Sequence, residues 1–276
     1  GKNRRLVFDL LRERGQMSRA EITRDTGMSF PTAMKVVDAF LEKGLLVELD
    51  ETGPAAGAGR KGRLLRFEPG AYRAVGVECE GRFARVGLAD MAGGMQARET
   101  IELGDFARTR DLSPLAAAIR RMCAAANGAP VLGVCIGFPA NLDPDAAAIV
   151  SYAAMDIQQP TSFAQVFPAF WREVELPVYL ENDANLACEG EAFLRRGAGG
   201  AANMLYLSIG SGCGGAVRLD GKLRRGARCR AGEVGAMLLQ PALGAPGRSA
   251  ARETLEDAVC LAALERRFGA ALRDGA

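Results

Sequence analysis

The sequence predicts an α/β protein with a helical N-terminal unit, followed by a larger unit in which strands alternate with helices. Residues 1–68 contain three segments with helical spacing of apolar residues and two short apolar strands. From residue 71 onward, short apolar runs alternate with helical patterns, which favours a largely parallel, doubly wound sheet. A short Pro-Gly linker at 68–70 separates the two patterns. We therefore expect domains at 1–68 and 71–276.

The composition is that of an ordinary globular protein. Of the 276 residues, 49% are apolar and 25% are charged, and the net charge of +2 does not by itself indicate a polyanionic partner. The seven cysteines are scattered without a CxxC pair, which indicates reduced thiols. The absence of histidine excludes histidine-based catalysis and histidine metal ligands. Without a signal peptide or a long apolar run, the sequence predicts a cytoplasmic protein with no membrane partner.

The N-terminal segments have clear start and stop signals. Ser18 and Glu21 form the capping box of a short helix that Gly27 ends, and Ser29 begins the next helix. The predicted helices are 4–14, 19–26 and 31–43, and the predicted strands are 45–49 and 62–68, around a loop at 50–61. This order is that of a winged helix-turn-helix, a DNA-binding motif.

The third helix of such a motif presents its N-terminal side chains to the major groove of DNA. The candidates are Ser29, Phe30, Thr32, Ala33 and Lys35, and Arg19 at the start of the short helix joins them. Hydroxyls bind bases or phosphates, Phe30 suits a thymine methyl, and Lys35 suits a phosphate. In the basic loop, Arg60 and Lys61 suit the minor groove. The alternative is a small helical domain with a solvated basic loop.

The larger unit contains seven predicted strands and four predicted helices. The strands are 73–80, 82–90, 94–103, 131–139, 176–181, 204–210 and 214–221. The helices are 112–126, 162–173, 184–194 and 252–272.

Three motifs in the second half of the chain occur in a particular order. Asn182-Asp183 at a strand end is followed by a glycine-rich turn at 209–215 and then by Ala231-Gly232-Glu233. This order resembles the ROK family (repressors, open reading frames, kinases). Residues 18–21 (SRAE), 27–32 (GMSFPT) and 59–60 (GR) also resemble the N-terminal domain of ROK repressors. The resemblance implies an actin-like, sugar-kinase-like (ribonuclease H-like) fold with two lobes after residue 71.

The resemblance also implies a sugar site. In ROK sugar kinases the acidic residue at the position of Asp183 is the catalytic base, and Asn182, Glu233 and Glu256 match sugar-contacting positions. The chain departs from the family at Ala140, where the family has glycine, and in segment 152–163, which lacks the usual Asn and Trp. Asn182 or Asp183 alternatively caps helix 184–194, and both roles are compatible. We expect an altered pocket that binds a sugar or a sugar derivative.

The glycine-rich turn at 209–215 either cradles phosphate through its backbone amides or is a tight hairpin. ROK kinases carry Asp-x-Gly-Gly-Thr in their first phosphate loop, where this chain has Glu78, Glu80 and Arg82. A carboxylate at position 80 repels a triphosphate, so we expect neither ATP nor magnesium to bind.

The zinc ligands of the family are one histidine and three cysteines. The matching positions are Ala236, Gly247, Ser249 and Thr254, so we expect no zinc.

Together these observations predict a transcriptional regulator, a repressor, that binds operator DNA as a dimer, senses a sugar and is not an enzyme. The chain stops about twenty residues after Glu256, so we expect a second lobe that is short either in the protein itself or because the protein continues beyond residue 276. Two alternatives remain open. One is an ATP-dependent kinase for hexoses or N-acetylhexosamines, and the other is an interaction protein without a ligand.

Overall fold

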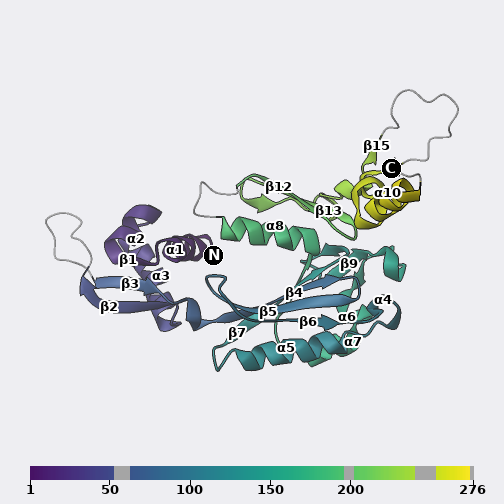
Figure 1. The fold of residues 1–276 in the computed structure, drawn as a ribbon. Helices are drawn as coiled ribbons and strands as arrows, with labels where there is room; N and C mark the ends of the chain where they lie inside the picture. The colour runs from purple at the N-terminus through teal and green to yellow at the C-terminus, as the bar shows by residue number, and fades with distance from the viewer. Residues whose placement is uncertain (53–62, 196–201, 240–252, 274–276) are drawn as a thin grey trace.

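The computed structural model describes residues 1–52, 63–195, 202–239 and 253–273, and Figure 1 shows how the helices and strands are arranged. The N-terminal part folds around a hydrophobic core of its own. It contains α1 (Lys2–Arg14), β1 (Gln16–Ser18), α2 (Arg19–Thr26), α3 (Phe30–Glu42), β2 (Leu46–Thr52) and β3 (Arg63–Phe67). The strands form an antiparallel sheet in the order β1-β3-β2. The short β1 was not predicted, because three residues are too few to show a two-residue period.

Local signals in this part act as the sequence predicts, with one exception. Ser18 accepts a hydrogen bond from the Glu21 amide, and the Glu21 carboxylate accepts one from the Ser18 amide at 2.8 Å, so the capping box is confirmed. Ser29 precedes α3, but its hydroxyl does not cap the helix. It instead lies 2.8 Å from the Thr32 hydroxyl.

A five-stranded sheet forms the centre of the larger part. Its strands are β4 (Arg73–Glu80), β5 (Phe83–Asp90), β6 (Met95–Glu102), β7 (Val131–Phe138) and β11 (Val178–Asn182). The order is β11-β7-β4-β5-β6. Strands β11, β7 and β4 run parallel, whereas β4, β5 and β6 are antiparallel. The prediction of a largely parallel sheet is therefore wrong, because the short turns between these three successive strands permit only hairpins.

Helix α5 (Ser113–Ala125) packs against β5 and β6 (Figure 1). Phe106, in α4 (Phe106–Thr109), has its ring centre 5.6 Å from that of Phe138 on β7. Four buried phenylalanines, Phe138, Phe163, Phe167 and Phe170, fill the adjoining core. The predicted helix 162–173 is in fact two helices, α6 (Phe163–Val166) and α7 (Pro168–Glu173). The break falls at Phe167, whose φ of −125° and ψ of 64° reflect the restriction that the following proline imposes.

Helix α8 (Asp183–Leu194) lies between two sheets. One side contacts β7, and another contacts the hairpin of β12 (Met204–Ile209) and β13 (Cys213–Leu219). Strand β14 (Lys222–Leu223) completes this second sheet. A Cβ at Gly137 would lie 3.4 Å from the Asp183 Cα and 3.2 Å from Leu186 Cδ2. Glycine at 137 therefore lets the first turn of α8 approach the central sheet closely.

The remaining elements are short. They are η1 (Pro69–Ala71), β8 (Asn141–Asp143), β9 (Ala148–Ser151), η2 (Ala153–Met155), β10 (Thr161–Ser162), η3 (Val234–Ala236), β15 (Leu238–Leu239), β16 (Glu253–Thr254), α9 (Leu255–Val259) and α10 (Leu261–Arg273). The predicted helix 252–272 is wrong at its start, where β16 pairs with β15. It is also interrupted at Cys260, which has an extended ψ of 160°.

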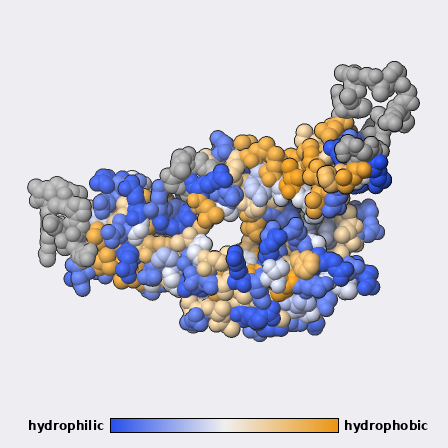
Figure 2. Space-filling model, in the orientation of Figure 1, coloured by the Kyte–Doolittle hydropathy of each residue, from blue (hydrophilic) through white to orange (hydrophobic). Residues whose placement is uncertain are grey.

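Large apolar side chains are exposed on β12 and α10. Figure 2 shows hydrophobic residues gathered there, at the upper right. The exposed residues are Leu205, Leu207, Ile209, Leu261, Leu264, Phe268 and Leu272. An apolar surface of this kind is typical of one that meets other protein. None of the helices in the described part of the chain is both long and apolar enough to span a membrane.

Candidate functional site

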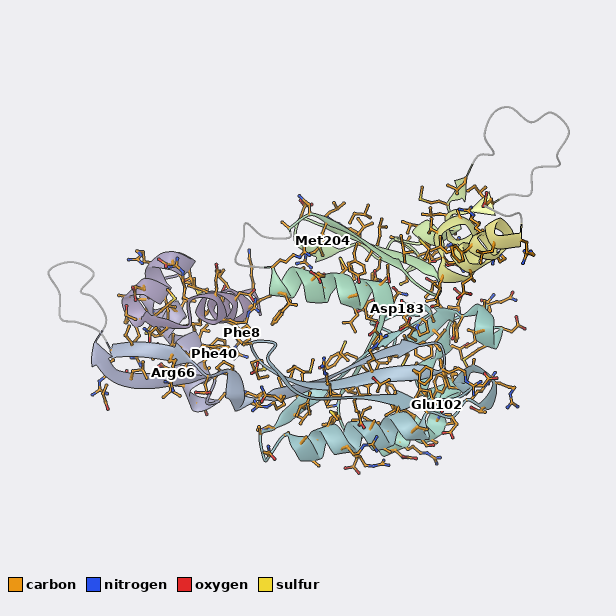
Figure 3. The ribbon with its side chains drawn as sticks, viewed as in Figure 1. Phe8, Phe40, Arg66, Glu102, Asp183 and Met204 are labelled. Carbon is orange, nitrogen blue, oxygen red and sulfur yellow. The ribbon has the colours of Figure 1, made fainter. Side chains whose placement is uncertain are left out.

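A cavity of about 850 Å³ opens between the central sheet and the β12–β13 hairpin. The four residues expected to contact a sugar, Asn182, Asp183, Glu233 and Glu256, all line it. They come from the end of β11, the start of α8, the segment before η3 and the first turn of α9. Figure 3 labels Asp183 at the right-hand end of α8, above the central sheet. The sequence thus predicted residues that the fold brings together from distant segments.

Asn182 and Asp183 hold the N-terminus of α8 at the cavity. Asn182 caps the helix, because its side-chain oxygen accepts a hydrogen bond from the Asn185 amide at 3.1 Å. Its Nδ2 donates to the Ala140 carbonyl at 3.3 Å. Asp183 accepts from the Ala184 amide at 2.8 Å. Burial raises the pKa of Asp183, although the Ala184 amide opposes the rise. The predicted helix cap is therefore confirmed for Asn182. Asp183, the next residue, lies at the cavity wall.

Glu233 reaches the cavity because the segment before η3 packs tightly against β13. Gly232 has a φ of 98°, and its carbonyl oxygen lies 2.9 Å from the position of a Cβ on Gly215. Glycine is needed at 232 for the positive φ and at 215 for the close approach of the two backbones. Partial desolvation raises the pKa of Glu233, and the nearby Arg230 opposes that rise.

A chain of hydrogen bonds connects Arg230 to Glu233 through two other side chains. Arg230 Nη2 donates to Ser151 Oγ at 3.1 Å. With the Asn141 amide oriented so that both its ends are satisfied, its oxygen accepts from Ser151 Oγ at 3.0 Å, and its nitrogen donates to Glu233 Oε1 at 2.7 Å. Arg230, Ser151 and Asn141 all line the cavity. These bonds fix a cation and a carboxylate on one wall.

The glycine-rich turn between β12 and β13 also lines the cavity. One oxygen of Glu256 accepts a hydrogen bond from the Cys213 amide at 2.9 Å. The same oxygen lies 3.1 Å from the position of a Cβ on Gly212. The Cys213 amide, which could otherwise donate to a phosphate, therefore already donates to a carboxylate of the protein. The hairpin reading of this turn agrees with the pairing of β12 and β13.

The end of β4 adds two further carboxylates, Glu78 and Glu80, to the cavity lining. Arg85 binds both, donating to Glu78 Oε2 and to Glu80 Oε2 at 2.8 Å each. Burial raises the pKa of the neighbouring Cys79 thiol to about 12, so the thiolate needed for nucleophilic attack does not form at neutral pH. The carboxylates at 78 and 80 are expected to repel the triphosphate of ATP.

The residues present do not fit zinc. Of the four positions matched to zinc ligands, Gly247 and Ser249 lie outside the described residues. Ala236 has no donor atom, and the Thr254 hydroxyl caps α9, where it accepts from the Asp257 amide at 3.2 Å. Among the described residues, no three or more His, Cys, Asp or Glu side chains are grouped to hold a metal ion.

Several cavity residues were not predicted as ligand contacts. They are Glu78, Glu80, Asn141, Ser151, Tyr152 and Arg230. Asn141 directly follows Ala140, and Arg230 lies three residues before Glu233. Their proximity to recognised motifs was therefore the available signal. Ser151 lies on β9, which has no sequence motif, and only the fold places it there.

The DNA-binding candidates differ in how accessible their side chains are. Ser29, Phe30 and Lys35 are exposed at the start of α3, with Phe30 56% exposed, and Thr32 is half-buried. Ala33 is buried in the core, so its prediction as a groove contact is wrong. Arg19 donates to Glu48 at 2.5 Å, which gives it a partner within the protein. Arg60 and Lys61 lie outside the described residues.

The N-terminal part contacts the far end of α8. The Arg12 guanidinium on α1 lies 3.8 Å from the centre of the Phe193 ring. This distance is within the range of a cation–π interaction. In Figure 1, α1 lies next to the left-hand end of α8. The cavity is at the other end of this helix, where Asp183 and Ala184 line it. A single helix therefore joins the cavity wall to the N-terminal part.

Comparison with known proteins agrees with these features. Residues 74–274 match the ROK family. The chain is 26% identical over 237 residues to a xylose repressor of Caldicellulosiruptor bescii, covering 84% of this chain and 57% of the repressor. It is 34% identical over 139 residues to a glucokinase of Halalkalibacterium halodurans, covering 48% of this chain and 39% of the glucokinase.

A similar fold is found in the crystal structure of a ROK family transcriptional regulator described as a homolog of the E. coli MLC protein. The TM-score is 0.72 at 18% identity, over 94% of this chain and 64% of that one. The chain therefore spans about three-fifths of the length of the regulators it matches. The alignment with this regulator includes most of the N-terminal part.

Proposed function

The chain belongs to the ROK family, and we propose that it is a DNA-binding transcriptional repressor whose sugar-kinase-like part senses a sugar derivative. The observation that carries the proposal is the exposed start of α3 beside the β2–β3 hairpin. This is the arrangement of a winged helix-turn-helix. Similarity to repressors over 84% of the chain supports the same function, whereas the glucokinase match covers 48%.

DNA recognition is assigned to residues 1–68. In this proposal the start of α3 enters the major groove, where Ser29 and Thr32 bond bases or phosphates, Phe30 contacts a thymine methyl and Lys35 binds a phosphate. Arg60 and Lys61 enter the adjacent minor groove. Arg19 stays a candidate for a phosphate only if DNA displaces Glu48 from it.

Effector recognition is assigned to residues 71–276. A sugar hydroxyl needs both donors and acceptors, and the cavity offers the Asn141 and Asn182 amides together with the Asp183 and Glu233 carboxyl groups. Asp183 here is a ligand contact and not a catalytic base. A sugar changes DNA binding only through a difference in its affinity for two arrangements of the protein.

We also propose that two copies act together. A dimer places two recognition helices on half-sites of a pseudo-palindrome, about 34–36 Å apart. The exposed apolar side chains of β12 and α10 support association with other protein. The expected operator is therefore an inverted repeat.

The rival function is that of a sugar kinase. The chain's similarity to a glucokinase and the presence of Asp183 favour it. The carboxylates Glu78 and Glu80 argue against it, because they line the cavity where the first phosphate loop of ROK kinases carries glycines. A coupled assay with ATP, hexoses and N-acetylhexosamines tests it, and turnover that Asp183→Asn abolishes would establish the kinase.

Selection of bound duplexes from a random pool tests the proposed function directly. We expect enrichment of an inverted repeat by the full chain and no enrichment by the Ser29→Ala, Lys35→Gln double variant. Absence of an enriched sequence in the wild-type sample contradicts sequence-specific DNA binding.

Thermal unfolding with hexoses and N-acetylhexosamines separates a sensor from an interaction protein without a ligand, because a sugar at 100 times its Kd adds ~2.7 kcal/mol to stability.

A further inference from the structure

We propose that the sugar bound in this cavity carries a carboxylate group, and that Arg230 binds that group. This inference rests on the proposed sugar-sensing function and names the class of effector. Neutral sugars need only the amide and carboxyl groups of the cavity. A sugar acid such as a hexuronate needs, in addition, a cation at one wall.

Arg230 lines the cavity, and it differs from two nearby arginines, Arg85 and Arg225, that do not line it. Arg85 binds Glu78 and Glu80, and Arg225 donates through Nε and Nη2 to Glu181 at 2.8 and 2.5 Å. Among the described residues, Arg230 has no ion pair, and its one hydrogen bond goes to Ser151. A guanidinium has five N–H donors, so most of those on Arg230 remain for a ligand.

The hydrogen-bond chain described above prepares Arg230 for this role. Ser151 accepts from Arg230 and donates to Asn141, which in turn donates to Glu233. The guanidinium therefore lies on the same wall as the carboxyl group that would bond the sugar hydroxyls. Prior orientation of this kind lowers the entropic cost of binding. A planar guanidinium also matches the two oxygens of a carboxylate.

The charges of the cavity favour a carboxylate over a phosphate. Glu78 and Glu80 share Arg85, and Glu256 bonds a backbone amide. Asp183 and Glu233 also line the cavity, and desolvation raises the pKa of each, so a ligand with less negative charge is favoured there. A carboxylate brings one negative charge, which Arg230 neutralises, whereas a phosphate brings nearly two.

The test compares matched sugars by calorimetric titration of the full chain. Glucuronate, galacturonate and mannuronate are each paired with the parent hexose, and the hexose 6-phosphates form a third group. We expect at least one uronate to bind about tenfold or more tightly than its parent hexose. Arg230→Gln should remove that preference, so that the uronate binds no more tightly than its parent hexose.

Arg228→Gln is the matched control, because Arg228 is an exposed arginine of the same segment that does not line the cavity. It should retain the uronate preference. The proposal is overturned if no uronate binds more tightly than its parent, if only the 6-phosphates do, or if Arg230→Gln keeps the preference. DNA binding is measured on the same samples. If the wild-type chain binds DNA selectively but shows no uronate preference, this inference alone is refuted. If it shows neither selective DNA binding nor a uronate preference, the proposed function is refuted as well.

Discussion

Asp183 lies at the cavity wall in a position that favours its neutral form. Burial raises its pKa above the usual value of 3.8, so the folded state holds this proton more tightly than the unfolded chain does. Stability therefore falls as pH rises through the range from 3.8 to the folded pKa. A carboxyl group kept at such a cost to stability is typical of a functional site.

Asp183→Asn should consequently stabilise the protein at neutral pH. The amide oxygen can still accept the Ala184 amide hydrogen bond, while the buried charge is removed. We expect the melting temperature at pH 7 to rise by about 2–4 °C, which corresponds to ~1 kcal/mol in a protein of this size. The gain should disappear below pH 3.8, where both states are protonated. A lower melting temperature at pH 7 would contradict this explanation.

Glu21 provides a control with the opposite sign. Hydrogen bonds from Ser18 lower the pKa of Glu21, so its contribution to stability is present above its usual pKa of 4.5 and is lost as the pH falls. Glu21→Gln should lower the free energy of unfolding at pH 7 by up to about 1 kcal/mol. The melting temperature should fall accordingly. The two variants should therefore differ least in acid, and thermal scans from pH 3 to pH 8 measure both.

At the residue scale, the sequence predicted the side chains that belong to motifs. Ser18, Asn182 and Glu233 were found because capping and sugar-site patterns depend on neighbours in the chain. Ser151 and Arg230 were missed, because their roles arise from a contact between segments 79 residues apart. Ala33 was assigned to the wrong face, because the start of a helix does not by itself show which residues the core covers.

At the scale of elements, α3 carries the DNA-binding proposal. Lys35 is exposed on its first half, where a phosphate contact releases a bound counterion. Lys35→Gln should reduce the slope of log affinity against log salt concentration by about one unit. Fluorescence anisotropy of the selected duplex over a range of salt concentrations measures the slope.

Lys43 serves as the matched control, because it is an exposed lysine at the other end of the same helix. Lys43→Gln should leave the slope unchanged. Equal slopes for wild type and Lys35→Gln would remove Lys35 from the DNA interface. Phe30→Ala should instead weaken binding to the selected sequence without altering the slope, since a thymine methyl carries no charge.

Helix α8 is the element that links the cavity to the N-terminal part. Its first turn holds Asp183, and near its end Phe193 contacts Arg12. A small shift of this helix on ligand binding would reach α1 directly. Phe193→Leu keeps an apolar side chain but removes the ring. We expect it to reduce the effect of the sugar on DNA affinity at least about threefold, within the usual range of coupling energies.

Leu194→Ala is the control for that change, because Leu194 is the adjacent residue and is largely exposed. It should leave the coupling unchanged. The affinities for sugar alone and for DNA alone should stay the same in both variants. If Phe193→Leu preserves the full effect of the sugar on DNA binding, α8 is not the link.

At the scale of the whole molecule, the sequence predicted the fold class and the order of the main elements. It did not predict the relative directions of the strands, or that two predicted helices are each divided into two. The α/β alternation after residue 71 was read from periodicity, which does not distinguish parallel from antiparallel neighbours. The short turns of the β4–β5–β6 meander decide that question. The breaks at Phe167 and Cys260 depend on packing around single residues, which a helical pattern does not record.

The central claim is that sugar binding in the cavity controls DNA binding by the N-terminal part. Its most direct test is the affinity of the full chain for the selected duplex, titrated with the uronate or other sugar that binds. We predict that a saturating sugar changes the Kd for DNA by 5-fold or more, and that DNA changes the Kd for the sugar by the same factor. An unchanged Kd for DNA in the presence of a bound sugar would contradict the account.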